Sequence, residues 1–311
     1  MDKFAQYGQN ADKKGWFRVF AGFSQQEKRG EGENYPTKLF PGDEHMNKVY
    51  QCFPGGKHKA LTMSYDDGRT QDRRLIEIFN KYGIRGTFHL NSGLMDENHV
   101  QPEEVPTLYK GHEVSCHTVT HPTIARCPLP NVAEEVLADR RALEKMCGYP
   151  VRGLSYPNGS VTKDIEALLP MCGIRYSRVV GSSGHFGLPE NPYRWQATCH
   201  HNTRLLELGE QFVSLFKQQY LYLMYVWGHS YEFDDKNNWD TMEAFCKLVG
   251  GREDTWYCTN IELYNAWADY QRLERSADRT QIYNPSARSV WVGDENGNTW
   301  EIKPGESVNC V

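Results

Sequence analysis

Apolar and polar residues follow two different periods along the middle of the chain. From residue 59 onward, short apolar runs typical of buried strands alternate with longer amphipathic runs that end in glycine. The pattern predicts strands over residues 60–65, 86–90, 113–116, 153–156, 175–180 and 221–227. Between them it predicts helices over residues 70–82, 132–147, 162–172, 204–220 and 240–249.

This alternation predicts a parallel sheet, most simply one closed into an α/β barrel. An open, doubly wound sheet is the alternative. However, no G-x-G-x-x-G motif follows the first predicted strand, which disfavours a dinucleotide-binding sheet.

The two ends of the chain have other patterns. Residues 1–57 are polar, rich in Gly, Lys and Glu, and without clear periodicity, so we expect an extension lying over the main domain. After residue 275 two alternating runs, SVWVGDENGNTWEI, surround an Asn-Gly turn and predict a β-hairpin. The predicted organisation is therefore an N-terminal extension (1–57), a barrel (58–275) and a small C-terminal β appendage (276–311).

Composition narrows the class of protein. Of the 311 residues, 39% are hydrophobic and 24% charged, values typical of a folded globular chain and not of a disordered or fibrous one. The net charge of −5 gives no electrostatic footprint for nucleic acid or an anionic membrane surface.

The sequence has no apolar leader and no membrane-length apolar window, so we expect a cytoplasmic protein unless a leader has been removed. Nine cysteines without a Cys-x-x-Cys pair predict buried free thiols.

Candidate catalytic groups follow the predicted strands, because a parallel barrel gathers them at the carboxyl ends of its strands. Asp66 and Asp67 follow the first strand, and Gly68 permits the sharp turn that brings both carboxylates to one site. His117 and His121 follow the third strand, four residues apart as on one face of a helical turn. Either pair alone is common in proteins, but two histidines and one aspartate form the three-ligand set of a catalytic zinc site.

Two further strand ends carry candidate groups. The run GLSYPNG (153–159) ends in a turn whose backbone N–H groups can serve as an oxyanion hole, although an ordinary β-turn is the better interpretation without context. The last predicted strand delivers His229. A lone histidine there is more often structural, but with a metal site on the same barrel face a general acid is the better role.

The order SYDDG, HTVTHP, GLSYPNG and a late apolar strand ending in His resembles the NodB-homology polysaccharide deacetylases, carbohydrate esterase family 4. The resemblance covers residues 58–270. It implies a distorted (β/α)7 barrel of the NodB type and a divalent metal ion, usually Zn2+, with Co2+ or Ni2+ as substitutes. It also implies hydrolysis of an N-acetyl group, less often an O-acetyl group, on a sugar or small glycan.

Carried onto this sequence, the resemblance implies that Asp67, His117 and His121 hold the metal. Asp66 would be the general base for water, and His229 the acid that protonates the leaving amine. The candidates for binding the oxyanion or substrate are Asn158, through its backbone N–H, with Tyr156, Pro157 and Trp227.

The sequence also departs from the family pattern. Many members have an arginine in the third motif that orients the base, whereas Ser155 stands there, with Arg152 three residues earlier. The aspartate of the fourth motif, which tunes the acid histidine, has no clear match in RYSRVVGSSGHF. We interpret Cys199, His200 and His201 as bystanders of the chemistry, and the carboxylates of residues 231–235 as solvated.

Two rival functions remain open. One is hydrolysis of a non-sugar amide or cyclic ureide, as in allantoinase-like enzymes, on the same metal site. The other is a catalytically idle carbohydrate-binding relative, against which the complete set of base, ligands and acid argues. The expected partner is an acetylated carbohydrate, and the C-terminal hairpin offers an edge for a homo-oligomer.

Overall fold

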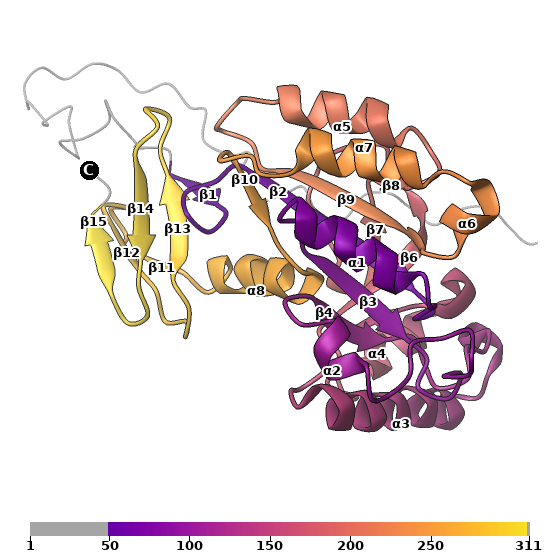
Figure 1. The fold of residues 1–311 in the computed structure, drawn as a ribbon. Helices are drawn as coiled ribbons and strands as arrows, with labels where there is room; N and C mark the ends of the chain where they lie inside the picture. The colour runs from indigo at the N-terminus through magenta and orange to yellow at the C-terminus, as the bar shows by residue number, and fades with distance from the viewer. Residues whose placement is uncertain (1–48, 310–311) are drawn as a thin grey trace, which may run out of the picture. The chain divides into compact units, whose positions relative to one another are not determined.

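The computed structural model describes residues 49–309, so most of the predicted extension lies outside the described residues. Its centre is a parallel sheet in the order β7-β6-β5-β4-β3-β2-β9-β8 (Figure 1). A further strand, β10 (Thr255–Tyr257), pairs with the first residues of β2. The other strands of this sheet are β2 (Lys59–Asp66), β3 (Gly86–Leu90), β4 (Glu113–Cys116), β5 (Gly153–Ser155), β6 (Tyr176–Ser182), β7 (Trp195–Ala197), β8 (Cys199–His200) and β9 (Tyr222–His229).

The segment formed by β7 and β8 closes this sheet into a barrel. Ala197 pairs with Ser182 of β6, and two residues later Cys199 pairs with Val226 of β9. Between them the Thr198 N–H donates to the Tyr225 carbonyl at 2.7 Å. One interrupted strand therefore bridges β6 and β9, and the ring consists of β2, β3, β4, β5, β6, the β7–β8 segment and β9. This confirms the distorted (β/α)7 barrel and rules out the open sheet.

Helices follow most strands, and the predicted helices are present with shifted ends. They are α1 (Asp72–Lys81), α2 (Val105–Leu108), α3 (Leu129–Cys147), α4 (Lys163–Leu168), α5 (Leu205–Ser214), α6 (Glu232–Lys236), α7 (Trp239–Val249) and α8 (Asn260–Tyr270), with short 3₁₀ turns η1 (Ile124–Arg126), η2 (Pro157–Gly159) and η3 (Pro192–Arg194).

Two helices differ from expectation. The helix expected over 204–220 ends at Ser214, because Leu215 already has an extended backbone. Helix α8 was not predicted, although Thr259 and Glu262 form the capping box that starts it.

The core lies where these helices pack on the barrel. All eight residues of β2 are buried, and Phe79 of α1 packs against Phe88 of β3. Helices α5 and α7 run side by side on the same layer (Figure 1). Burial of each such large apolar side chain contributes about 1.5–3 kcal/mol, so the core between helices and barrel stabilises the fold.

The C-terminal hairpin is confirmed. Strands β13 (Val290–Gly293) and β14 (Thr299–Ile302) pair antiparallel around a turn in which Asp294 accepts from the Asn296 and Asn298 N–H groups. The first described strand, β1 (Tyr50–Cys52), pairs with β13 and so joins this sheet. A second small sheet contains β11 (Glu274–Arg275), β12 (Gln281–Tyr283) and β15 (Ser307–Asn309).

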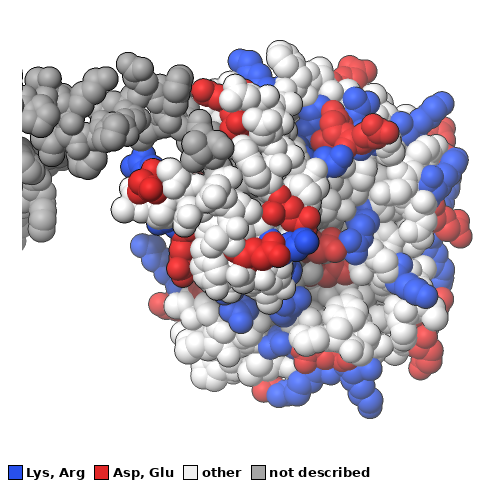
Figure 2. All heavy atoms as spheres, turned by 90° about the vertical axis from the view of Figure 1, so that its left-hand side faces the viewer, with Lys and Arg blue, Asp and Glu red and all other residues white. Residues whose placement is uncertain are grey.

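Other properties of the described part agree with the composition. The eight cysteines among residues 49–309 are free thiols, and six of them are buried. Acidic and basic side chains are interspersed over the face shown in Figure 2. Within residues 49–309, no helix has both the length and the apolar character required to cross a bilayer.

Candidate active site

The two adjacent aspartates at the carboxyl end of β2 differ in backbone conformation and in burial. Asp66 is the last residue of the strand and is buried, whereas Asp67 adopts a positive φ of 76° and is partly exposed. Gly68 continues the bend at φ 64°, and a Cβ there would lie 2.8 Å from Leu90 Cδ2. The turn therefore requires glycine, and it aims two neighbouring carboxylates at one site.

The histidines of the second motif come together by a different route from the one expected. Residues 117–121 form an irregular loop instead of a helical turn, with positive φ at Thr118 (67°) and His121 (55°). The loop still places His117 Nε2 3.5 Å and His121 Nε2 3.8 Å from Asp67 Oδ1. The predicted spacing found the pair, but the predicted helical geometry was wrong.

The partners of His117 leave one ring nitrogen available. Its Nδ1 lies 2.8 Å from the Ser155 carbonyl oxygen, which can only accept, so Nδ1 carries the hydrogen and Nε2 presents its lone pair. The buried carboxylate of Asp139 accepts from the His117 backbone N–H. Burial lowers the pKa of His117, which favours the neutral ring that a metal requires.

Asp67, His117 and His121 therefore fit a divalent metal ion. One carboxylate oxygen and two imidazole nitrogens lie within 4.8 Å of one another. This donor set is typical of catalytic zinc, which keeps a further position for water or substrate. His121 is 28% and Asp67 21% exposed, so one side of the group faces solvent.

Asp66 is held by an arginine that sequence reasoning missed. Arg178 of β6 is 1% exposed, and its Nη2 forms a close ion pair with Asp66 Oδ2. The other carboxylate oxygen, Oδ1, is buried without a hydrogen-bond partner among the described residues. Burial alone would raise the pKa of Asp66, but the Arg178 guanidinium, followed by nearby histidines, holds it well below its usual range.

Arg178 contacts Ser155, the residue that stands where the resemblance implies an arginine. Its Nη2 also donates to Ser155 Oγ at 3.0 Å, and its Nε donates to Ser64 Oγ at 3.1 Å. Its guanidinium carbon lies 4.5 Å from the centre of the Trp227 ring. The small Ser155 leaves room for an arginine from the next strand. The sequence signal that could have identified Arg178 was a single cation inside an otherwise uncharged strand, YSRVVGS.

His229 has a carboxylate partner that the sequence reading placed in solvent. Residues 66 and 229 are partners in the pairing of β2 with β9, so the candidates for base and acid end adjacent strands. Glu232, the first residue of α6, accepts from His229 Nδ1 at 3.2 Å and is only 21% exposed. Burial lowers the pKa of His229, but the bond to Glu232 and the carboxylates of Asp66 and Asp67 outweigh this and raise it.

The contact with His229 corrects the solvated interpretation of Glu232. His200 and His201, taken as bystanders, also border Glu232. The spacing of three residues between His229 and Glu232, at the start of a helix, was the signal in the sequence.

The remaining candidates lie around this group. Asn158 has a positive φ of 56° within η2 and an exposed side chain, whereas Pro157 is buried. Tyr156 is buried, and its hydroxyl donates to the Tyr193 carbonyl. Trp227 is 7% exposed, and its Nε1 is buried without a partner among the described residues. Their roles in binding substrate stay predictions.

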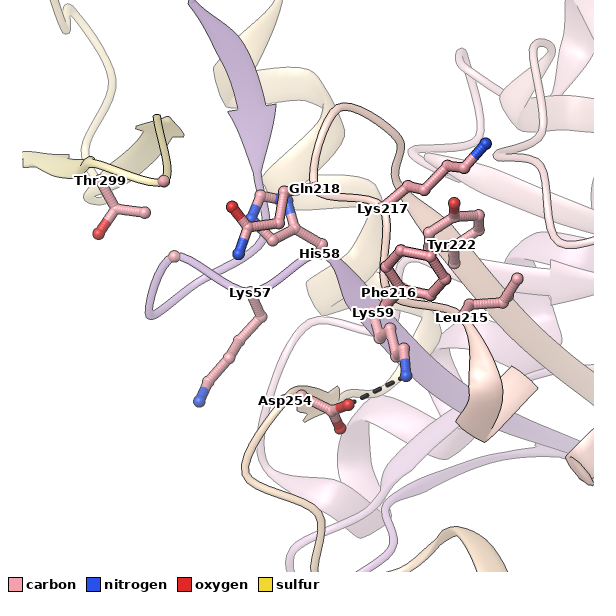
Figure 3. Close-up of a pocket in the computed structure, with 12 residues that line it drawn as sticks. Lys57, His58, Lys59, Leu215, Phe216, Lys217, Gln218, Tyr222, Asp254 and Thr299 are labelled. Carbon is pink, nitrogen blue, oxygen red and sulfur yellow. Dashed lines mark hydrogen bonds and ion pairs between the residues drawn. The ribbon is translucent and has the colours of Figure 1, made fainter. Parts of the chain in front are cut away.

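A pocket of about 330 Å³ lies elsewhere (Figure 3). It is lined by residues at the amino ends of β2 and β9, including His58 and Tyr222, and Lys59 there pairs with Asp254 at 3.0 Å. Asp66 and His229 stand at the opposite ends of these strands. The pocket is therefore separate from the candidate active site.

Comparison with known proteins shows what the barrel is similar to. Residues 54–177 match the family model described as polysaccharide deacetylase. Over these residues the chain is similar to the polysaccharide deacetylase family. The match contains the first three motifs of the deacetylase domain and ends one residue before Arg178.

Two curated relatives are deacetylases of acetylated glycans. A chitooligosaccharide deacetylase of Bradyrhizobium sp. is 32% identical over 128 residues, which is 40% of this chain and 52% of the relative. A peptidoglycan-N-acetylglucosamine deacetylase of Bacillus cereus is 22% identical over 127 residues, 38% of this chain and 44% of the relative. The matched segment thus spans about half the length of these relatives.

A solved structure supports the fold of the barrel. The crystal structure described as that of a polysaccharide deacetylase from Mycobacterium smegmatis aligns with a TM-score of 0.55 at 14% identity. The alignment covers 73% of this chain and 96% of that one, so it extends well beyond the segment matched by the family model.

Proposed function

We propose that this protein is a metal-dependent hydrolase that removes an acetyl group from an N-acetylated sugar or small glycan. One observation carries the proposal: beside the three-ligand group of Asp67, His117 and His121 lies a second buried carboxylate with one oxygen held and one unpartnered. That is the arrangement expected of a general base for water.

Each residue has a defined task in this proposal. Asp67, His117 and His121 would hold the ion, which supplies Lewis-acid polarisation of the acetyl carbonyl and of water when bound. Asp66 Oδ1 accepts the proton of the attacking water while Arg178 fixes Oδ2. His229, with Nδ1–H bonded to Glu232, keeps Nε2 for donating a proton to the leaving amine.

The comparisons support the reaction class. The curated relatives named above remove acetyl groups from chitooligosaccharide or from the N-acetylglucosamine of peptidoglycan. We extend the amide-hydrolysing chemistry to this chain and leave its glycan to experiment. We propose Zn2+ as the ion, because its donor preference matches two imidazoles and a carboxylate, with Co2+ as a working substitute.

The test is acetate release from a panel of N- and O-acetylated mono- and oligosaccharides, by metal-stripped protein with and without added Zn2+ or Co2+. We expect release that requires metal and that favours N-acetylated sugars. Protein that holds metal but releases no acetate from any sugar would contradict the proposal. Cyclic ureides and non-sugar amides, run in the same assay format, would then identify the rival hydrolase.

A further inference from the structure

A second group of metal-ligating side chains lies beside the acid. His200 and His201 follow each other at the end of β8, and Glu232 begins α6. His200 Nε2 lies 3.2 Å and His201 Nε2 2.9 Å from Glu232 Oε2. The three ligand atoms lie within 4.8 Å of one another, as in the first group.

His201 is a fully buried polar residue whose ring nitrogens make no hydrogen bond of normal geometry among the described residues. Its side chain is fully buried, stacked between the Tyr65 ring at 5.6 Å and the Phe233 ring at 4.2 Å. Neither ring nitrogen makes a hydrogen bond of acceptable geometry among the described residues, although Nε2 is close to Glu232. Buried polar groups without partners are rare, and each calls for an explanation such as a bound ion.

We propose that His200, His201 and Glu232 form a second binding site for a divalent transition metal ion of the Zn2+ class. Two imidazole nitrogens and one carboxylate oxygen match the donors that Zn2+ prefers. An ion there would also coordinate His201 Nε2, which makes no hydrogen bond of normal geometry among the described residues.

This second site binds more weakly than the first. His200 Nδ1 accepts from the Asn202 backbone N–H at 3.2 Å, so the neutral ring carries its hydrogen on Nε2. Binding through Nε2 must move that hydrogen and break this bond. Glu232 Oε2 also accepts from Asn202 Nδ2 at 3.0 Å. In the first site, by contrast, the Nε2 of His117 is already free. The second ion is therefore bound only when metal is in excess.

Occupation of this site would slow the reaction, a consequence that rests on the proposed function. Glu232 Oε1 holds His229 Nδ1 at 3.2 Å, and an ion on the same carboxylate draws its charge away from that bond. The rings of His200 and His229 are 6.3 Å apart, so the ion would also stand close to the group that donates the proton. Excess zinc should then act as an inhibitor.

The experiment counts bound ions in metal-stripped full-length protein after dialysis against Zn2+ at one equivalent and in excess. We expect one ion and then two in the wild type, and one under both conditions in His200→Gln. Glu232→Gln should lose the same second ion. His185→Gln, a change at an exposed histidine outside both groups, is the matched control and should bind two. Co2+ in place of Zn2+ reports each site by its absorption spectrum.

Acetate release is measured in the same Zn2+ titration. The rate of each variant is divided by its own rate at one equivalent of Zn2+. We expect several-fold inhibition by excess Zn2+ in the wild type and in His185→Gln, and none in His200→Gln. A single ion in the wild type at excess zinc, or two in His200→Gln, would overturn the site. Two ions without inhibition would overturn its effect on catalysis. The ion count needs no substrate. It therefore tests the second metal site even if the proposed deacetylase activity is not found.

Discussion

The two groups of two histidines and one carboxylate differ in the hydrogen-bond partners of their ligands. In the first, His117 Nδ1 faces the Ser155 carbonyl, so Nε2 is free for an ion. In the second, Asn202 donates to His200 Nδ1, and Glu232 already holds His229. The same residue types therefore favour different tautomers. The hydrogen-bond partner of Nδ1 decides whether Nε2 presents a lone pair to a metal ion. It therefore distinguishes the two groups more than the residue types of their ligands do.

The largest difference should appear when one histidine is removed from each group. His117→Gln should lose the tightly bound ion and reduce acetate release about a thousandfold, equivalent to roughly 4 kcal/mol of transition-state stabilisation. His200→Gln should keep that ion. Metal content and acetate release, measured together, check both. If the two variants lost the same amount of tightly bound metal, the distinction between the groups would be wrong.

Arg178→Met tests the buried ion pair between Arg178 and Asp66, which lies beside the first group. The change leaves the Asp66 carboxylate buried without its cation, so the free energy of unfolding should fall by about 3–5 kcal/mol. Urea denaturation measures this. Arg194→Met is the control, because Arg194 is 46% exposed, and loss of such a pair with Glu166 costs about 0–1 kcal/mol. Equal losses in both variants would show that Arg178 has no special role.

Gly228→Ala tests how tightly His201 is packed. A Cβ at Gly228 would lie 2.0 Å from His201 Nδ1, so the ring must move, and we expect a loss of about 1–3 kcal/mol in the free energy of unfolding. The added methyl should also weaken the second metal site. Gly187→Ala places a Cβ 3.2 Å from the exposed His185 ring and should cost less than about 0.5 kcal/mol. An unchanged stability in Gly228→Ala would mean that His201 is not fixed.

Glu232→Gln should change the pH dependence of turnover at one equivalent of zinc. The proposed acid His229 can donate its proton only when protonated, so activity should be present below its pKa and lost as pH rises through it. The bond to Glu232 raises that pKa against the opposing effect of burial. Loss of the carboxylate should therefore move the alkaline limb to lower pH. Asp235→Asn, at an exposed carboxylate of the same helix, should leave the limb in place, and an unmoved limb in Glu232→Gln would exclude Glu232 as the partner of the acid.

The comparison also explains how much of the molecule was predictable from sequence. The barrel strands follow from apolar runs that end in polar motifs, and β3 and β4 were predicted with the bounds observed. Asp67, His117 and His121 come together as expected, because strand ends meet at one edge of a parallel barrel. Groups at strand ends could therefore be predicted to meet, even though Asp67 and His117 are far apart in the sequence.

The rest of the site depends on contacts between distant strands. Arg178 reaches Asp66 across 112 residues, and Glu113, Tyr176 and Ser115 form a similar buried polar contact within the barrel. No periodicity reveals which strand interior will carry a cation, because that choice depends on the size of its neighbour, here Ser155. The β7–β8 closure and the pairing of β1 with β13 were likewise set by long-range packing.

The most direct test of the account is acetate release by Asp66→Asn beside the wild type, both loaded with one equivalent of Zn2+. The central claim is that Asp66, with one oxygen held by Arg178, activates water at the metal. The account predicts that turnover falls about 10²–10⁴-fold while the tightly bound ion is retained. A variant that keeps its ion, remains folded and turns over at the wild-type rate would contradict it.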